Sequence, residues 1–382
     1  MLAFPTISEC EQLLAQFSQI KIAVFGDFFL DEYLAIDSSL EERSLETGLP
    51  AHQVVQVRSS PGAAGTVAKN LAALGIGEIW AIGAIGNDGR GFELARHLEN
   101  LGVRTDNLLR CENRSTPTYT KPCRIAGQSG RSQSANALGT SNASLPRERS
   151  QPAIEMERLD ILHRAEFESD IVQELLARLD ALAGQVNGVA ALDQVATPKL
   201  GLIQQQTRNQ FAAIAARHDS TIFLADSRGS IGEFESVVLK ANRQEICSAG
   251  DPHAITDLLE VAKAARKQCR RTGKPVFATC GEDGLLVCLE HGTVHVPAVP
   301  ASVPIDVTGA GDTATATLLS TMCAGANPII AAVLANVAAS ISIEQIGETG
   351  VATAPAILSR LADFLDKARE NPQKFALKEI TS

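Results

Sequence analysis

The sequence predicts an α/β fold in which a parallel sheet lies between two layers of helices. Short apolar runs alternate with amphipathic helical stretches along most of the chain, as in successive βαβ units. The runs are apolar on both strand faces, which is typical of parallel strands covered by helices on each side. The chain has 382 residues, 45% of them hydrophobic, so it can bury a large core.

The expected elements have local signals at their ends. The first strand, 20–27 (IKIAVFGD), stops at Gly-Asp, and the first helix, 65–75, stops at a glycine. A strand at 78–86 follows, and the turn GNDG then precedes a helix at 89–103. The later expected strands are 188–193, 222–226, 237–242 and 275–281, with helical stretches at 211–217 and 257–271 between them.

Two segments, 52–60 and 115–127, alternate apolar and polar residues, as strands with one solvated face do. They predict a small antiparallel sheet beside the main one. We therefore expect a single domain over 1–382 with lid segments inserted at 32–60 and 112–165. Within the second segment, 127–156 is rich in Ser, Asn, Gly and Arg and has few large apolar residues, which predicts a flexible loop.

Composition excludes several classes of partner. The net charge of −10 argues against nucleic acid, because binding a duplex needs a basic face. Eight cysteines at irregular intervals, with no C-x-x-C pair, predict reduced thiols and a cytoplasmic protein. The N-terminus shows no secretory signal pattern. The uncharged stretch 313–343 is broken at 325–328, so we interpret it as two buried helices and expect no membrane partner.

The stretch IDVTGAGDTATA (305–316) carries the strongest chemical signal. Gly309 and Gly311 allow a tight turn, and the uncharged run after them predicts a helix that begins near Ala310. The N-terminus of a helix attracts phosphate through unpaired N–H groups and the helix dipole. Asp312 could then accept a proton from an attacking hydroxyl as a general base. By spacing alone, Asp312 could equally be only a helix cap after a glycine turn.

These residues resemble a known family. DVTGAGDT is similar to the second signature of the PfkB/ribokinase family of carbohydrate kinases, and SPGAAGTVAKNLAALG (60–75) is similar to the first. Within that family, VFGDFFLDEYL (24–34), ADSRG (225–229) and KANRQEI (240–246) most resemble the heptose-7-phosphate kinases of ADP-heptose synthesis. The resemblance runs from about residue 20 to 360, interrupted by 127–156.

The resemblance implies a ribokinase-like three-layer α/β/α sandwich with a small β-sheet lid. It implies an ATP-dependent kinase that uses Mg²⁺ and phosphorylates a hydroxyl of a sugar or sugar phosphate; the nearest relatives suggest the anomeric hydroxyl of a heptose 7-phosphate. It also implies a homodimer formed through the lid. By analogy, a monovalent cation such as K⁺ would lie near the turn GETG (347–350).

Site residues follow from the resemblance position by position. Asp312 would be the base, with Thr308, Gly309, Ala310 and Gly311 forming the anion hole. Glu245 would hold Mg²⁺ through water. The substrate would be bound by Asp27, Asp31, Gly62, Ala63, Thr66 and Asp193. ATP would be bound by Asp226, Asn242, Glu245, Thr279, Gly281, Gly284, Thr308 and Asn336.

The chain departs from the family pattern in its sugar site. Ala63 and Thr66 stand where the family usually has glycine and asparagine, and Ala196 stands where the heptose-phosphate kinases have lysine. A catalytically inactive sugar- or nucleotide-binding relative with a regulatory role therefore stays open as an alternative, although the intact GAGD favours an enzyme. A nicotinamide oxidoreductase fits poorly, because GAGDTA lacks a third glycine and an acid about 20 residues later.

Overall fold

The computed structural model describes residues 2–125, 154–195, 197, 199–247, 257–302, 304–347 and 349–380. The chain divides into two compact units. The larger comprises Met1–Leu30, Pro61–Pro117 and Leu162–Ser382, and the smaller comprises Asp31–Ser60 and Thr118–Ile161. The predicted flexible loop 127–156 lies largely outside the described residues, and so does Ala196.

The larger unit is built on a ten-stranded sheet with the order β17-β16-β15-β14-β13-β12-β11-β1-β6-β7. The strands from β7 to β14 pair in parallel, and β15, β16 and β17 continue the sheet antiparallel. Their bounds are β1 Lys21–Gly26, β6 Glu78–Gly86, β7 Val103–Cys111, β11 Gly188–Asp193, β12 Ile222–Ser227, β13 Val238–Asn242, β14 Val276–Thr279, β15 Leu285–Leu289, β16 Gly292–Val296 and β17 Lys378–Glu379.

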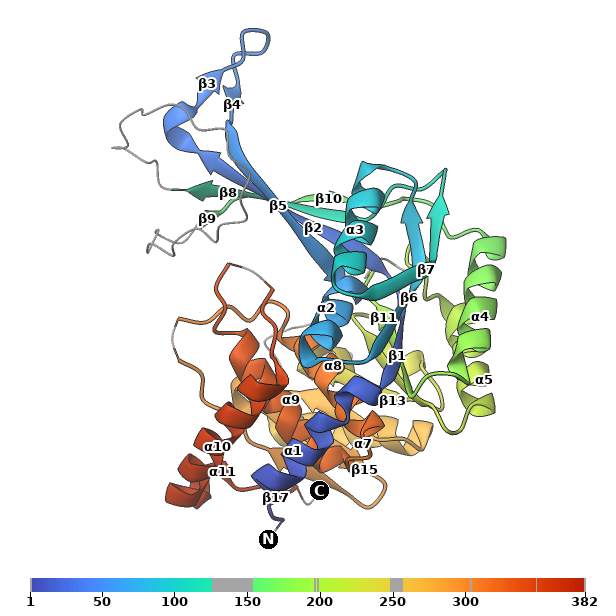
Figure 1. Ribbon diagram of the computed structural model, residues 1–382, viewed down its shortest axis with the longest axis vertical. Coiled ribbons are helices and arrows are strands. Elements are labelled where there is room, and N and C mark those ends of the chain that lie inside the picture. The colour runs from blue at the N-terminus through green and yellow to red at the C-terminus, as the bar shows by residue number, and fades with distance from the viewer. Residues whose placement is uncertain are drawn as a thin grey trace. The chain divides into compact units, whose positions relative to one another are not determined.

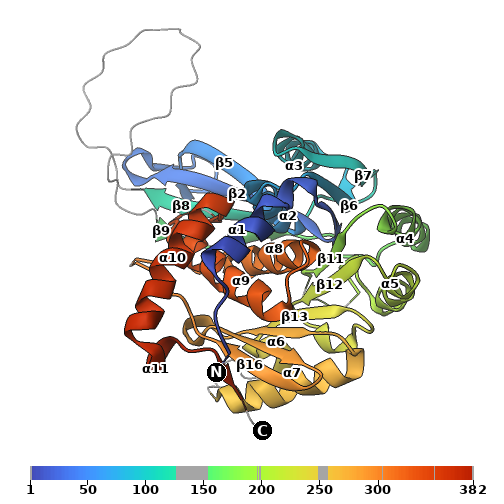
Figure 2. The ribbon, with the colours of Figure 1, turned by 60° about the horizontal axis from the view of Figure 1, so that its bottom comes forward.

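Helices cover both faces of this sheet, as Figure 2 shows. One apolar core joins the sheet to helices that include α1 Ile7–Ala15, α2 Ala64–Leu74, α3 Gly89–Asn100, α8 Ala310–Cys323, α9 Pro328–Ser342 and α10 Ala354–Glu370. A second core lies on the other face under α4 Ser169–Ala183, α5 Gln205–Arg217 and α7 Leu258–Thr272. The short helices α6 Arg243–Cys247 and α11 Pro372–Phe375 complete the unit. The predicted three-layer α/β/α architecture is confirmed.

The uncharged stretch 313–343 forms α8 and α9, which are largely buried in the first core. Asn327 caps α9 by accepting hydrogen bonds from the amides of Ile329 and Ile330, and Pro328 occupies the first turn. Among the helices of the described residues, none has the length and apolarity that a membrane span requires.

The smaller unit is a β structure (Figure 1). Its main sheet has the order β10-β8-β2-β5, with β9 paired to β8, and β3 and β4 form a separate two-stranded ribbon. The bounds are β2 Phe28–Asp37, β3 Glu42–Arg43, β4 Pro50–Ala51, β5 Val54–Ala63, β8 Thr118–Ile125, β9 Ile154–Glu155 and β10 Leu159–Ile161. β2 differs from the sequence prediction, in which Gly-Asp at 26–27 ends a strand; the chain instead continues into a second strand at Phe28.

Candidate active site

The polar residues of the motifs gather at the carboxyl ends of neighbouring parallel strands, the edge where open α/β sheets bind ligands. Asp27 follows β1, Asp193 ends β11, Asp226 and Ser227 end β12, and Asn242 ends β13. The strand order places β1, β11, β12 and β13 side by side. The sheet therefore brings together residues that are more than 200 positions apart in the chain.

The register of the strands decides which of these side chains meet. Asp226 pairs directly with Lys240 across β12 and β13, and Asp193 pairs with Ser227 across β11 and β12. Successive residues of a strand point to opposite faces. Asp226 and Lys240 consequently point toward α8, whereas Asp193 and Ser227 point toward α5.

A buried polar cluster lies between the sheet and α8. Lys240 Nζ donates a hydrogen bond of 2.8 Å to Asp226 Oδ2, and the hydroxyl of Thr315 donates one of 2.7 Å to the same oxygen. Both members of the ion pair are at most 5% exposed. Burial opposes the charged form of Lys240, but the carboxylates of Asp226, Glu245 and Asp312 raise its pKa overall. The lysine is therefore held as a cation.

The start of α8 lies next to this cluster. Gly309 has φ +83° and precedes the helix, and a Cβ there would overlap Thr349 Cγ2. A Cβ built on Gly311 would lie 3.0 Å from Lys240 Nζ. Asp312 is half-buried in the first turn. A side chain at position 311 would therefore occupy the space between the first turn of α8 and the Lys240 ammonium, and glycine leaves that space unfilled.

Asn242 and Glu245 form a reciprocal cap at the start of α6. The amide N–H of Asn242 donates to Glu245 Oε2 at 2.7 Å, and the amide N–H of Glu245 donates to Asn242 Oδ1 at 3.0 Å. Burial and the nearby Asp226 carboxylate raise the pKa of Glu245. Across the described residues, no group of three or more His, Cys, Asp and Glu side chains could enclose a metal. This donor set suits Mg²⁺ that keeps its waters and its phosphate ligands.

Asp27 is buried and its carboxylate accepts three backbone hydrogen bonds. Oδ2 accepts from the amides of Gln194 and Val195 at 3.0 and 3.3 Å, and Oδ1 accepts from the amide of Leu202 at 2.9 Å. Burial raises its pKa in spite of these bonds. Asp27 therefore fixes the loop that follows β11.

A small cavity of about 20 Å³ adjoins Asp27, and its lining includes Arg114, Ser115 and His163. The Arg114 guanidinium lies over the Phe167 ring, 3.6 Å from its centroid, and donates to the carbonyl of Glu166. A cavity of this size holds about one water molecule.

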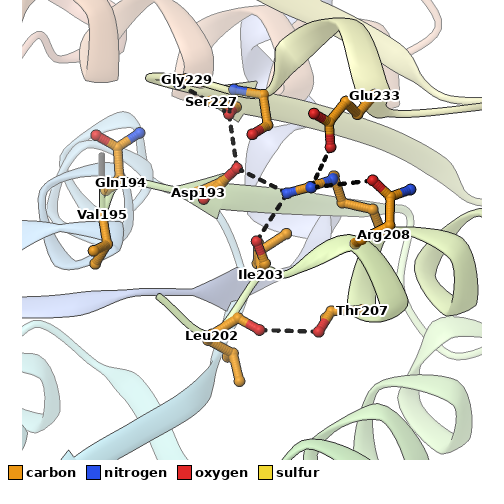
Figure 3. A network of polar contacts seen from close by, with 12 residues as sticks. Asp193, Gln194, Val195, Leu202, Ile203, Thr207, Arg208, Ser227, Gly229 and Glu233 are labelled. Carbon is orange, nitrogen blue, oxygen red and sulfur yellow. Dashed lines mark hydrogen bonds and ion pairs between the residues drawn. The ribbon is translucent and has the colours of Figure 1, made fainter. Parts of the chain in front are cut away.

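Asp193 lies in a second network on the α5 face (Figure 3). Its Oδ2 accepts a hydrogen bond of 2.7 Å from Ser227 and lies 3.6 Å from Arg208, which is also paired with Glu233. Burial, with the Asp27 charge adding to it, raises the pKa of Asp193 to about 7. Arg208 also donates to the carbonyl of Ile203, so this network ties the loop after β11 to the turn after β12.

The first-signature residues lie at the junction of β5 and α2. Gly62 is buried, and the Thr66 hydroxyl donates to the carbonyl of Pro61 at 3.2 Å. Ala63 adopts φ +53° and ψ −121°, a conformation that L-residues rarely take. Asp31 belongs to the smaller unit, where it lies 3.8 Å from the Lys121 ammonium.

Two of the residues expected around the nucleotide base, Asn336 and Gly284, meet at the backbone of Val296 and Pro297. The Asn336 side chain donates to the carbonyls of Val296 and Pro297 at 3.1 Å each, and a Cβ on Gly284 would overlap the carbonyl of Val296. Nearby in the sheet, the Thr279 hydroxyl donates to the carbonyl of Ala241 at 3.4 Å, and Gly281 has a positive φ in the next turn. Thr308 is exposed, and its amide donates to Asp306 Oδ1.

Several residues of these networks were not predicted from the sequence, among them Lys240, Thr315 and Arg208. Lys240 had the clearest signal, because it is a lysine two positions before Asn242 inside an apolar strand. Thr315 and Arg208 had no distinguishing signal, since hydroxyls and arginines are common on helices.

Comparison with known proteins identifies the family of the chain. The family model described as "pfkB family carbohydrate kinase" matches residues 21–354. The curated relative "Bifunctional protein HldE" of Trichlorobacter lovleyi is 28% identical over 375 residues, which covers 97% of this chain and 69% of the relative. The protein of that name from Shewanella baltica is 30% identical over 342 residues, which covers 88% of this chain and 63% of the relative. The chain thus spans about two thirds of the length of these relatives.

Solved structures show the same fold. A ribokinase from Arabidopsis thaliana complexed with ribose and ATP superposes with a TM-score of 0.63 at 17% identity, covering 90% of this chain and 98% of that one. Phosphofructokinase-2 from Escherichia coli in complex with potassium gives a TM-score of 0.66 at 16% identity, covering 91% and 99%. Since the family model spans most of the sequence, the chain belongs to the pfkB family of carbohydrate kinases and is a phosphotransferase with an alcohol group as acceptor.

Proposed function

We propose that this kinase transfers the γ-phosphoryl group of ATP to a hydroxyl of a sugar phosphate, with the anomeric hydroxyl of a heptose 7-phosphate as the leading candidate. The observation that carries the proposal is the cluster at the start of α8. There the Lys240 ammonium and the open first turn at Gly311 adjoin three carboxylates, those of Asp226, Glu245 and Asp312. The heptose preference rests on the sequence resemblance and on the HldE relatives.

In this proposal Asp312 accepts the proton of the acceptor hydroxyl. The hydroxyl oxygen then forms a bond to the γ-phosphorus, the bond from that phosphorus to the β–γ bridging oxygen breaks, and ADP leaves. The backbone N–H groups of Gly309 and Gly311 at the start of α8 stabilise the charge that develops on the phosphoryl oxygens. The amides of Thr308 and Ala310 already donate to Asp306 Oδ1 and to the carbonyl of Val307. Glu245 and Asn242 would hold Mg²⁺ through water, and the ion, when bound, would neutralise part of the charge of the phosphates.

The Asp27 carboxylate can accept one more hydrogen bond, from a hydroxyl of the substrate. A carboxylate has about four lone-pair sites, and the backbone amides of Gln194, Val195 and Leu202 use three of them. We assign the remaining site, on Oδ1, to the sugar. Gly62, Ala63, Thr66, Asp31 and Asp193 stay proposed substrate residues, although the Thr66 hydroxyl and the Asp193 carboxylate are already engaged in the networks described above.

We assign Thr279, Gly281, Gly284 and Asn336 to the side of the nucleotide base. We also propose a monovalent-cation site, such as one for K⁺, beside the turn 347–350. Its support is the Thr349 hydroxyl, which is buried and has no hydrogen-bond partner among the described residues.

We further propose a homodimer formed through the smaller unit, which would act as a lid. Val55 and Val57 lie on one face of β5 at the edge of its sheet and are 49% and 58% exposed. Exposed apolar residues in such a row favour burial against a second copy. A cytoplasmic location is consistent with eight free cysteines.

The test is ADP release from MgATP across a panel of sugars and sugar phosphates that includes heptose 7-phosphates, with Asp312→Asn as the matched variant. We expect turnover with one class of sugar phosphate and at least about a hundredfold loss in the variant. Stimulation by no sugar, together with retained binding of ATP or a sugar, would favour the catalytically inactive relative.

A further inference from the structure

We propose that Arg208 is a positioning residue for the sugar: it fixes the Leu202 amide on Asp27 so that one lone pair of that carboxylate stays open for a substrate hydroxyl. This inference rests on the proposed function, in which Asp27 binds the sugar. Arg208 belongs to α5 and acts through the backbone. The carbonyl of Ile203 accepts a hydrogen bond of 3.0 Å from Arg208 Nη1 (Figure 3).

Two adjacent residues before α5, Leu202 and Ile203, are held by the first turn of that helix. The Thr207 hydroxyl donates to the carbonyl of Leu202 at 3.0 Å, and Arg208 donates to the carbonyl of Ile203. The amide of Leu202 donates in turn to Asp27 Oδ1 at 2.9 Å. The two carbonyl contacts therefore restrict the direction from which the Leu202 amide approaches Asp27.

The direction of this approach decides which part of Asp27 is open. Oδ2 already accepts hydrogen bonds from two backbone amides, whereas Oδ1 accepts one, from Leu202. Each oxygen of a carboxylate has about two lone-pair sites. A shift of the Leu202 amide around Oδ1 would therefore move or block the site that we assign to the sugar.

Arg208 is itself fixed by several partners. It is buried, is paired with Glu233, and lies 3.6 Å from Asp193 Oδ2. Asp193 ends β11, and Glu233 belongs to the turn after β12, so residues at the ends of two neighbouring strands hold the guanidinium. A planar guanidinium has five N–H donors and can bond to several groups at once, whereas a lysine ammonium is a point charge.

Stability alone does not account for this arrangement. Arg208 Nε is buried and has no hydrogen-bond partner among the described residues, and a buried donor without a partner costs free energy. A packed apolar cluster of similar volume is often at least as stable as a buried ion pair. The alternative role for Arg208 is only to join the turn after β12 to the loop after β11 through Glu233. The positioning role depends on the contact with Ile203, and the alternative depends on Glu233.

The experiment measures kcat, the KM for the best sugar substrate and the KM for MgATP in the wild type and three variants. Arg208→Met removes the donor to Ile203. Glu233→Gln is the matched control, because it removes the charge that pairs with Arg208 on a side chain that is 49% exposed and keeps the bond to Ile203. Thr207→Val removes the neighbouring bond to Leu202 without changing any charge, so it tests the same segment if Arg208→Met folds poorly.

We expect Arg208→Met to raise the KM for the sugar about tenfold, as the loss of one well-aligned hydrogen bond does. We expect kcat to change less than about threefold and the KM for MgATP less than about twofold, because the lost contact contributes to sugar binding and not to the chemical step. Thr207→Val should raise the sugar KM about threefold, and Glu233→Gln should keep the wild-type value.

An equal rise of the sugar KM in Arg208→Met and Glu233→Gln would overturn the positioning role and leave the proposed function standing. So would a wild-type sugar KM in Arg208→Met or, where that variant does not fold, in Thr207→Val. A wild type without sugar-dependent turnover would overturn the proposed function and this inference together.

Discussion

Nζ of Lys240 lies 2.8 Å from Oδ2 of Asp226, and the two residues are direct partners in the parallel pairing of β13 with β12. The position of the ammonium is therefore set by two hydrogen-bonded strands and not by a loop. Side chains on paired strands keep their positions during ligand binding and release better than side chains on loops.

Gly311→Ala should impair catalysis with little effect on folding. The added Cβ would lie 3.0 Å from Lys240 Nζ, so the ammonium or the helix start must shift by a few tenths of an ångström. We expect kcat to fall at least about tenfold, because small misplacements at a reacting centre are costly. Gly89→Ala is the control, since nothing lies within 4 Å of its Cβ. Wild-type kcat in Gly311→Ala would contradict the proposed crowding.

Asp27→Asn should loosen the loop that follows β11. An amide nitrogen in place of one carboxylate oxygen cannot accept the backbone hydrogen bonds now made to that oxygen. We expect amide hydrogen exchange of Gln194 and Val195 to speed up about tenfold, which corresponds to about 1.4 kcal/mol. The KM for the sugar should rise as well. Unchanged exchange in this loop would show that Asp27 does not fix it.

Ala63→Gly should stabilise the protein. Alanine at φ +53° is strained, and glycine relieves the strain at a smaller cost in chain entropy. We expect the free energy of unfolding in urea to rise by about 1 kcal/mol. Ala64→Gly, at the first position of α2, is the matched comparison and should lower it by about 1 kcal/mol, because Ala64 is fully buried and glycine adds chain entropy. A loss of stability in both variants would rule out strain at Ala63.

Asp193→Asn should reduce the dependence of stability on pH. Burial raises the pKa of Asp193 to about 7 in the folded protein, from 3.8 for the ordinary side chain. Between these values the folded state binds a proton that the unfolded state has released, so stability falls as pH rises. We expect the free energy of unfolding to fall less from pH 5 to pH 8 in the variant than in the wild type. The difference between the two proteins should be on the order of 2 kcal/mol. An identical drop in both proteins would show that Asp193 is already ionised at pH 5.

The fold class and the start of α8 could be predicted from sequence because their signals are local. Gly309 and Gly311, followed by the uncharged run from residue 313, indicate the start of a helix without any information from distant parts of the chain. The partners of Asp27 could not be predicted, since Gln194 is 167 positions away. Lys240 was missed for a related reason: only the register of β12 against β13 pairs it with Asp226.

The alternation along β12 has a consequence for how this site can vary. Asp226 and Ser227 are adjacent, yet Asp226 bonds to Thr315 of α8, and Ser227 bonds to Asp193 in the network on the α5 face. Deleting a single residue upstream in β12 would exchange the two faces, turning a hydroxyl toward Lys240 and a carboxylate toward Arg208. An apolar substitution inside β12 leaves Asp226 and Ser227 on their own faces of the sheet, whereas an insertion or deletion of one residue moves both to the opposite face.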